Sequence, residues 1–277
     1  MNWIQSLLSG FVWGLSEPMP LSADAHRGLL RYFFGSGPED PLMTLACHCA
    51  IVLMLLAYGR LDLGSLRQTA RLRQMPRRRR SPRTNLNQSG TLQLLRLALI
   101  PTILGRLLSG HFSLLSERLW MLSVTLTLSG ILLWLPGLFR TANRDGRHMS
   151  AADALLLGLG AMSAAIPGFS AVGTVLALGS LLGLHRLYAL RIAWLLLLAA
   201  QATDIGMGLL SLIGAGFRFT LPAILSALAA GIAAAAGAYI AVHTMRTLIR
   251  PSRGGFSGFS FYNWGMALLC LLLFLLV

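Results

Sequence analysis

Residues 14–26 read Gly-Leu-Ser-Glu-Pro-Met-Pro-Leu-Ser-Ala-Asp-Ala-His, and they interrupt an otherwise apolar N-terminal region. The stretch carries two acids, a histidine and two prolines, and a proline stops a helix. An acidic side chain costs at least about 2–3 kcal/mol to bury in a membrane, so such residues usually have a function. A second polar break, Ile-Pro-Gly-Phe-Ser-Ala-Val-Gly-Thr at 166–174, follows later in the chain. We predict that these two breaks meet in the membrane and form one site.

The composition predicts an all-α polytopic membrane protein. Of the 277 residues, 55% are hydrophobic and only 12% are charged, whereas about 25% of a soluble domain is usually charged. Several apolar stretches reach the roughly 20 residues that a helix needs to cross a bilayer core. The N-terminal region lacks the basic residues that begin a cleavable signal peptide, so we expect it to belong to the membrane domain.

The net charge of +14 comes from arginine, because the chain contains no lysine. In a soluble protein this excess would suggest nucleic acid, but here the arginines fall in loops between apolar stretches. Arginine concentrates on the cytoplasmic side of membrane proteins, where anionic lipids also attract it. We therefore predict that loop 60–91, with its arginine run at 77–80, is cytoplasmic and that both termini lie outside. We expect no nucleic-acid partner.

The apolar pattern predicts about six membrane-spanning helices, at 42–58, 92–109, 118–139, 187–213, 220–244 and 261–277. Two further segments, 3–34 and 151–183, each consist of two short helices around a polar turn. We interpret them as re-entrant hairpins, because such a break is tolerated at membrane depth only inside protein or beside a water-filled cavity. The hairpins would enter from opposite sides, so the single domain would be an inverted repeat of about 1–139 and about 150–277. In inverted-repeat proteins, matching broken helices mark the binding site.

Residues 10–26 resemble the N-terminal motif of the bacterial undecaprenyl-diphosphate phosphatase family of the bacitracin-resistance type, roughly G-x-x-E-G-x-x-E-F-L-P-I-S-S-T-G-H. Residues 167–174 resemble its second motif, P-G-x-S-R-S-G-A-T, and weaker similarity at 46–62 and 183–191 extends the match over nearly the whole chain. The resemblance implies two re-entrant hairpins, six spans and an inner-membrane location. It also implies a polyprenyl pyrophosphate ligand in the lipid-carrier recycling of cell-wall peptidoglycan synthesis.

The resemblance further implies roles for individual residues. Glu17 and His26 match a glutamate and the histidine of the first motif, and we predict them to be catalytic. Asp24 is an added carboxylate that could act with them and could hold Mg²⁺ or Ca²⁺ together with Glu17. Four groups at the two breaks are expected to bind phosphate oxygens: Ser22, Gly168, Ser170 and Thr174.

Two motif positions depart from the family pattern. Trp13 stands where the first glutamate belongs, and Ala171 stands where the second motif has arginine. Losing an arginine that clamps phosphate commonly costs about 10²–10⁴ in rate. Outside the second break, Arg27, Arg186 and Arg191 are candidates to reach the site in its place.

These departures leave three functions open. The protein could hydrolyse polyprenyl pyrophosphate, or it could be a non-catalytic relative that carries polyprenyl phosphate across the bilayer, since inverted repeats are common in transporters. It could also hydrolyse another lipid phosphate, with Asp24 and His26 in a rearranged mechanism. Ser22 and Ser170 have a structural alternative as helix caps, and His48 and Asp204, inside predicted spans, could line the cavity or only join helices. The sequence leaves the lipid chain length and the oligomeric state open, a homodimer included.

Overall fold

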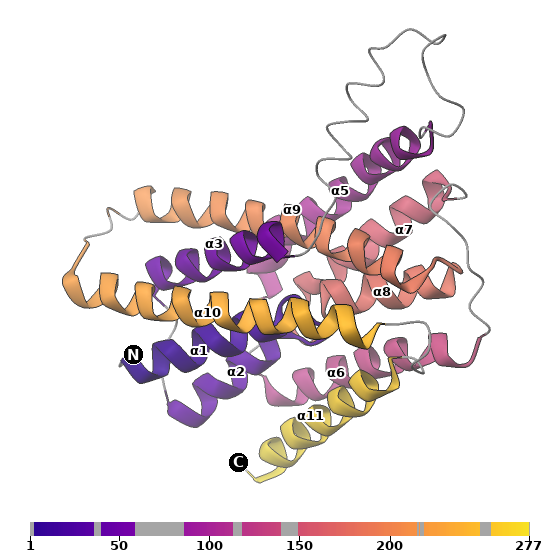
Figure 1. Cartoon of the computed structure of the whole chain (residues 1–277). Helices are drawn as coiled ribbons and strands as arrows, with labels where there is room; N and C mark the ends of the chain where they lie inside the picture. The colour runs from indigo at the N-terminus through magenta and orange to yellow at the C-terminus, as the bar shows by residue number, and fades with distance from the viewer. Residues whose placement is uncertain are drawn as a thin grey trace, which may run out of the picture.

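The computed structural model describes residues 3–35, 40–58, 86–112, 118–139, 149–214, 216, 219–249 and 256–276, with side chains of the 86–112 helix described from residue 94 onward. These residues form ten α-helices and no strand (Figure 1). The longer helices are α3 (Pro41–Tyr58), α5 (Leu86–Phe112), α6 (Leu119–Trp134), α9 (Arg186–Gly214), α10 (Leu221–Leu248) and α11 (Ser257–Leu276). The shorter ones are α1 (Trp3–Ser16), α2 (Ala23–Phe34), α7 (Ala151–Met162) and α8 (Ala171–Leu181).

Five helical segments of the described chain are long and apolar enough to cross a membrane, which fits a multi-pass membrane protein. They are Pro41–Tyr58, Leu119–Gly137, Arg186–Gly214, Leu221–Leu248 and Ser257–Leu276, and each overlaps most of one predicted span. The remaining predicted span, 92–109, lies in α5, which is 27 residues long but carries Arg96 and Arg106. Helix α5 begins at Leu86, inside the predicted loop 60–91; residues 60–85 lie outside the described part of the chain.

The outer faces of the long helices are apolar. Leu210 and Ile213 of α9 and Ile232 of α10 are at least 70% exposed. A soluble protein rarely exposes so many large apolar side chains together. This surface is suited to contact with lipid tails.

Helix α1 lies against α10 because both present small residues to each other (Figure 1). A Cβ added at Gly10 would overlap the backbone of Ala230, and one at Gly14 would overlap that of Ala234. Glycine and alanine at four-residue spacing let two membrane helices approach closely. The end of α1, where the first polar break begins, is thereby fixed in the bundle.

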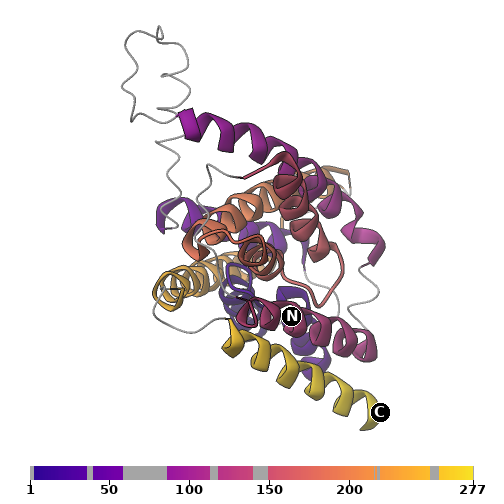
Figure 2. The ribbon, with the colours of Figure 1, turned by 90° about the vertical axis from the view of Figure 1, so that its right-hand side faces the viewer.

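Helices α6 and α11 pack together on the side of the bundle opposite α5 (Figures 1 and 2). A small apolar cluster joins them to α2, with Leu29 of α2, Leu122 of α6 and Cys270 of α11 all buried in it. This cluster fixes the start of α2, which directly follows the first break.

Candidate functional site

The first break is a turn between α1 and α2. Pro18 cannot donate a backbone hydrogen bond to continue the helix, and its carbonyl accepts a bond from Trp194 Nε1 on α9 at 3.0 Å. Helix α2 then begins after Ser22, whose Oγ accepts from the Ala25 N–H at 3.2 Å. Serine is a preferred N-cap because it satisfies an otherwise unpaired N–H of the first turn.

The second break joins α7 to α8 and touches the first directly. Gly168 has φ +104°, a conformation that glycine adopts readily, and its N–H donates to Ser22 Oγ at 3.1 Å. Ser170 caps α8 by accepting from the Gly173 N–H at 3.2 Å, and its hydroxyl donates to the Met19 carbonyl at 3.0 Å. The predicted meeting of the two breaks is confirmed, and the two serines that join them also cap helices.

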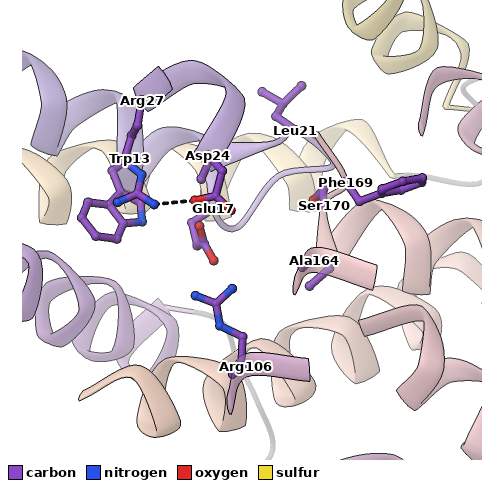
Figure 3. Close-up of a pocket in the computed structure, with 11 residues that line it drawn as sticks. Trp13, Glu17, Leu21, Asp24, Arg27, Arg106, Ala164, Phe169 and Ser170 are labelled. Carbon is purple, nitrogen blue, oxygen red and sulfur yellow. Dashed lines mark hydrogen bonds and ion pairs between the residues drawn. The ribbon is translucent and has the colours of Figure 1, made fainter. Parts of the chain in front are cut away.

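A pocket lies between the two breaks (Figure 3). Its polar lining consists of Glu17, Asp24, Arg27, Arg106 and Ser170, and its apolar lining includes Trp13, Phe169 and Ala171. Two acids and two arginines therefore share one small space inside an otherwise apolar protein.

One arginine of the pocket is held by Trp13 and Asp24. Arg27 Nη2 donates to Asp24 Oδ1 one turn earlier on α2, and its Cζ lies 3.7 Å from the centroid of the Trp13 ring. Trp13, which replaces a motif glutamate, thus supports a cation through its ring face. Of the three arginines expected as candidates, Arg27 lines the pocket; Arg186, which lies over the Phe256 ring, and Arg191 are not in its lining.

The other arginine of the pocket was not predicted from the sequence. Arg106 on α5 binds both oxygens of Asp204 on α9, from Nε to Oδ1 at 2.9 Å and from Nη2 to Oδ2 at 2.6 Å. Figure 3 shows Arg106 pointing toward Glu17 from the side opposite Arg27. The sequence does contain one indication of this ion pair, which is an arginine and an aspartate inside two separate apolar segments. Buried charges in membrane proteins pair with one another, so the two residues could have been expected to meet.

A buried polar network behind the pocket links Glu17 to Asp204. Gln201 Nε2 on α9 donates to Glu17 Oε1 at 2.8 Å. The amide oxygen of Gln201 accepts from His48 Nδ1 on α3, and the same Nδ1 lies 3.8 Å from Asp204 Oδ2. The His48 ring also packs edge-on against Trp13 at 4.8 Å between centroids. His48 and Asp204 therefore belong to the network behind the pocket, and Glu17 is held from that side.

Several predicted site residues lie outside the pocket lining. His26 Nδ1 contacts the Ser22 carbonyl at 2.6 Å, and its Nε2 contacts the Tyr262 hydroxyl of α11 at 2.7 Å. The Thr174 hydroxyl accepts from Ser163 Oγ at 3.0 Å. Of the predicted residues, Glu17, Asp24 and Ser170 line the pocket, whereas Ser22, His26, Gly168 and Thr174 do not. Their predicted roles remain predictions.

The donor set of the pocket fits a magnesium ion that arrives with a phosphorylated ligand. The described residues include no group of three or more His, Cys, Asp or Glu side chains suited to a metal. The pocket does contain two carboxylates, Glu17 and Asp24. Mg²⁺ is usually held by one or two carboxylates together with substrate phosphates and water, whereas Ca²⁺ takes about six to eight oxygens. Calcium would therefore need most of its ligands from outside the protein.

This architecture defines a class: a multi-pass helical membrane protein with a buried charged pocket where two broken helix pairs meet. The family model described as "Bacitracin resistance protein BacA" matches residues 6–269, and the chain belongs to this family. The family resemblance carried by the two motifs is confirmed.

Relatives from several bacteria carry the name undecaprenyl-diphosphatase. The protein of Carboxydothermus hydrogenoformans is 25% identical over 99% of this chain and 98% of its own. That of Pelotomaculum thermopropionicum is 29% identical over 76% of each chain. That of Gemmatimonas aurantiaca is 28% identical over 69% of this chain and 70% of its own. The chain is thus a distant member of its family.

Proposed function

We propose that this protein binds a polyprenyl pyrophosphate in the pocket between the two breaks and hydrolyses it to polyprenyl phosphate and inorganic phosphate. The observation that carries the proposal is the joint placement of Glu17, Asp24, Arg27 and Arg106 in that pocket. Arginine binds phosphate oxygens in bidentate fashion, and carboxylates can accept a proton or hold a metal. Membership of the family, with relatives named undecaprenyl-diphosphatase, supports this ligand class. The product would re-enter lipid-carrier recycling for cell-wall synthesis.

In the proposed reaction, water attacks the terminal phosphorus and the bond to the bridging oxygen breaks. Glu17 accepts the proton of the attacking water, and Gln201 holds its carboxylate in place. A magnesium ion, when bound by Glu17 and Asp24, would neutralise charge on the phosphate oxygens. His26 has both ring nitrogens engaged away from the pocket, so in this mechanism it supports the start of α2.

We also infer that helices α1–α2 and α7–α8 are re-entrant hairpins of an inverted repeat. The longest of the four, α1, has 14 residues, so at about 1.5 Å per residue each is shorter than a bilayer core of about 30 Å. Helix α5, with 27 residues, is long enough to be the sixth span. The arginine-rich loop 60–91 would be cytoplasmic and both termini outside, in the bacterial inner membrane.

A second candidate is a carrier that moves polyprenyl phosphate across the bilayer without hydrolysis. It is favoured by the loss of the motif arginine at Ala171 and by the pairing of both pocket arginines with aspartates. Paired arginines bind an anion less strongly, which suits release better than stabilisation of a transition state. A phosphatase for a different lipid phosphate would use the same pocket.

The test is phosphate release by purified protein supplied with undecaprenyl pyrophosphate and Mg²⁺. Glu17→Gln should lower the rate by about 10²–10⁴, because it removes the proton acceptor. Asp153→Asn, at the third position of α7, is the matched control, since an asparagine oxygen can still accept from the Ser150 N–H as Asp153 does. If wild type releases no more phosphate than Glu17→Gln, the phosphatase proposal is wrong. Glu17-dependent transfer of polyprenyl phosphate across proteoliposomes would then support the carrier, and release from other lipid phosphates would identify another substrate.

A further inference from the structure

The guanidinium of Arg106 has one edge bound and one edge turned to the pocket. Asp204 occupies Nε and Nη2. An arginine carries five N–H donors in a planar fork, and Nη1 of Arg106 makes no hydrogen bond to the described part of the chain. Figure 3 shows this side chain directed into the pocket toward Glu17. A second edge with this geometry is suited to two oxygens of one phosphate group.

The backbone of α5 is held close to the second break by glycines. A Cβ added at Gly105 would lie 2.8 Å from Met162 Cα on α7, and one added at Gly158 of α7 would overlap the Ala98 carbonyl on α5. Helices α5 and α7 therefore pack backbone to backbone. Because Gly105 directly precedes Arg106, this contact fixes the arginine next to the α7–α8 break.

Arg106 and Ala171 line the same pocket. Ala171 begins α8 and stands where the motif of the resembled family has arginine. The Arg106 side chain is 16% exposed, more than the 6% of its partner Asp204, so the arginine is the member of the pair that reaches the pocket. A cation is thus supplied to this space from α5.

We propose that Arg106 is the phosphate-contacting arginine of this chain, held in orientation by Asp204, and that it takes the place of the arginine missing at position 171. Asp204 is then a positioning residue. The ligand group is the terminal phosphate of a lipid pyrophosphate, so the inference rests on the proposed function. It predicts that binding depends on an arginine in α5 that the family motifs do not contain.

The experiment measures binding of the non-hydrolysable methylene-bridged analogue of farnesyl pyrophosphate, with Mg²⁺, to the purified full chain in detergent. The test variant is Arg106→Met/Asp204→Leu, which removes both charges of the pair, so that no Asp204 carboxylate is left buried without its partner. We expect it to bind about 10- to 100-fold more weakly, the usual effect of losing a charge-assisted hydrogen bond. Arg96→Met, an exposed arginine on the same helix, should bind like wild type.

Each outcome separates a structural role from a binding role. If Arg106 only neutralised Asp204, the double variant would bind like wild type, and the inference would be wrong while the proposed function stands. If wild type itself fails to bind, both are wrong. Adding Ala171→Arg to the double variant should recover part of the affinity, and no recovery would show that the two positions do not share a ligand group. Should the double variant fail to fold, Arg106→Lys keeps the charge but loses the planar fork, so it should bind about tenfold more weakly; unchanged binding would overturn the inference.

Discussion

Replacing Gly168 with alanine tests how the two helix breaks are held together. Gly168 has φ +104°, and such a conformation costs a residue with a side chain about 1–3 kcal/mol. The added Cβ would also lie 2.6 Å from the Cβ of Thr125 on α6 and overlap its hydroxyl, and overpacking costs about 1–3 kcal/mol. A backbone shift that relieved the overlap would weaken the bond from the Gly168 N–H to Ser22 Oγ. We expect Gly168→Ala to lower the free energy of unfolding by about 2–6 kcal/mol.

The measurement is reversible unfolding in mixed micelles of dodecyl maltoside and SDS, followed by tryptophan fluorescence. Thr125→Ala removes the atom that the new Cβ would overlap most, so the two substitutions together should show a coupling free energy of at least about 0.5 kcal/mol. Gly206→Ala is the matched control, because its Cβ would meet no atom within 4 Å; it should be neutral or stabilising by up to about 1 kcal/mol. A loss below about 0.5 kcal/mol for Gly168→Ala, within the range of ordinary surface changes, would refute the steric account of the junction.

Three further substitutions test the surroundings of the pocket. Gly14→Val should destabilise the protein by about 1–3 kcal/mol in the same assay, because its side chain would overlap the backbone of Ala234; a neutral result would mean that α1 and α10 do not pack this closely. Ser170→Ala should cost about 1–3 kcal/mol, since it removes a helix cap and the bond between the breaks, and no loss would show that the junction does not depend on it. Tyr262→Phe should cost about 0.5–1.5 kcal/mol by removing the bond to His26 while leaving phosphate release unchanged. A large fall in release would instead place His26 in the reaction.

The sequence predicts where the site lies because the relevant rules are local. Two prolines close together interrupt the helix at the first break and a Pro-Gly step interrupts it at the second, and acids in an apolar segment mark a functional position, so both breaks are visible without a structure. The hydroxyls of Ser22 and Ser170 each precede a helix, and capping was the stated alternative to phosphate binding. In the structure each hydroxyl is already bonded within the junction. Helix capping and phosphate binding would therefore need the same oxygen atoms.

Arg106 and Gln201 could not be assigned from one sequence because their role depends on which helices are neighbours. Each lies in a long apolar helix, and its periodicity does not reveal that Arg106 of α5 lines the pocket and that Gln201 of α9 bonds to Glu17. The ion pair itself could have been predicted from charge, because Arg106 and Asp204 are opposite charges in separate apolar helices and each needs a partner. The sequence does not predict that this pair lies at the edge of the pocket rather than elsewhere along the two helices.

The position of His26 follows from helix geometry once the start of α2 is known. Successive residues of an α-helix are rotated by about 100°, so residues two apart point in nearly opposite directions and residues three apart share a face. Helix α2 begins at Ala23, and Asp24 and Arg27 accordingly line the pocket together. His26, two residues after Asp24, then points nearly opposite to it and meets Tyr262 of α11. Because the Ser22 cap holds the first turn of α2 in place, a shared role for Asp24 and His26 would need a ligand that contacts α2 on two sides, and phosphate release by Tyr262→Phe tests whether His26 takes part.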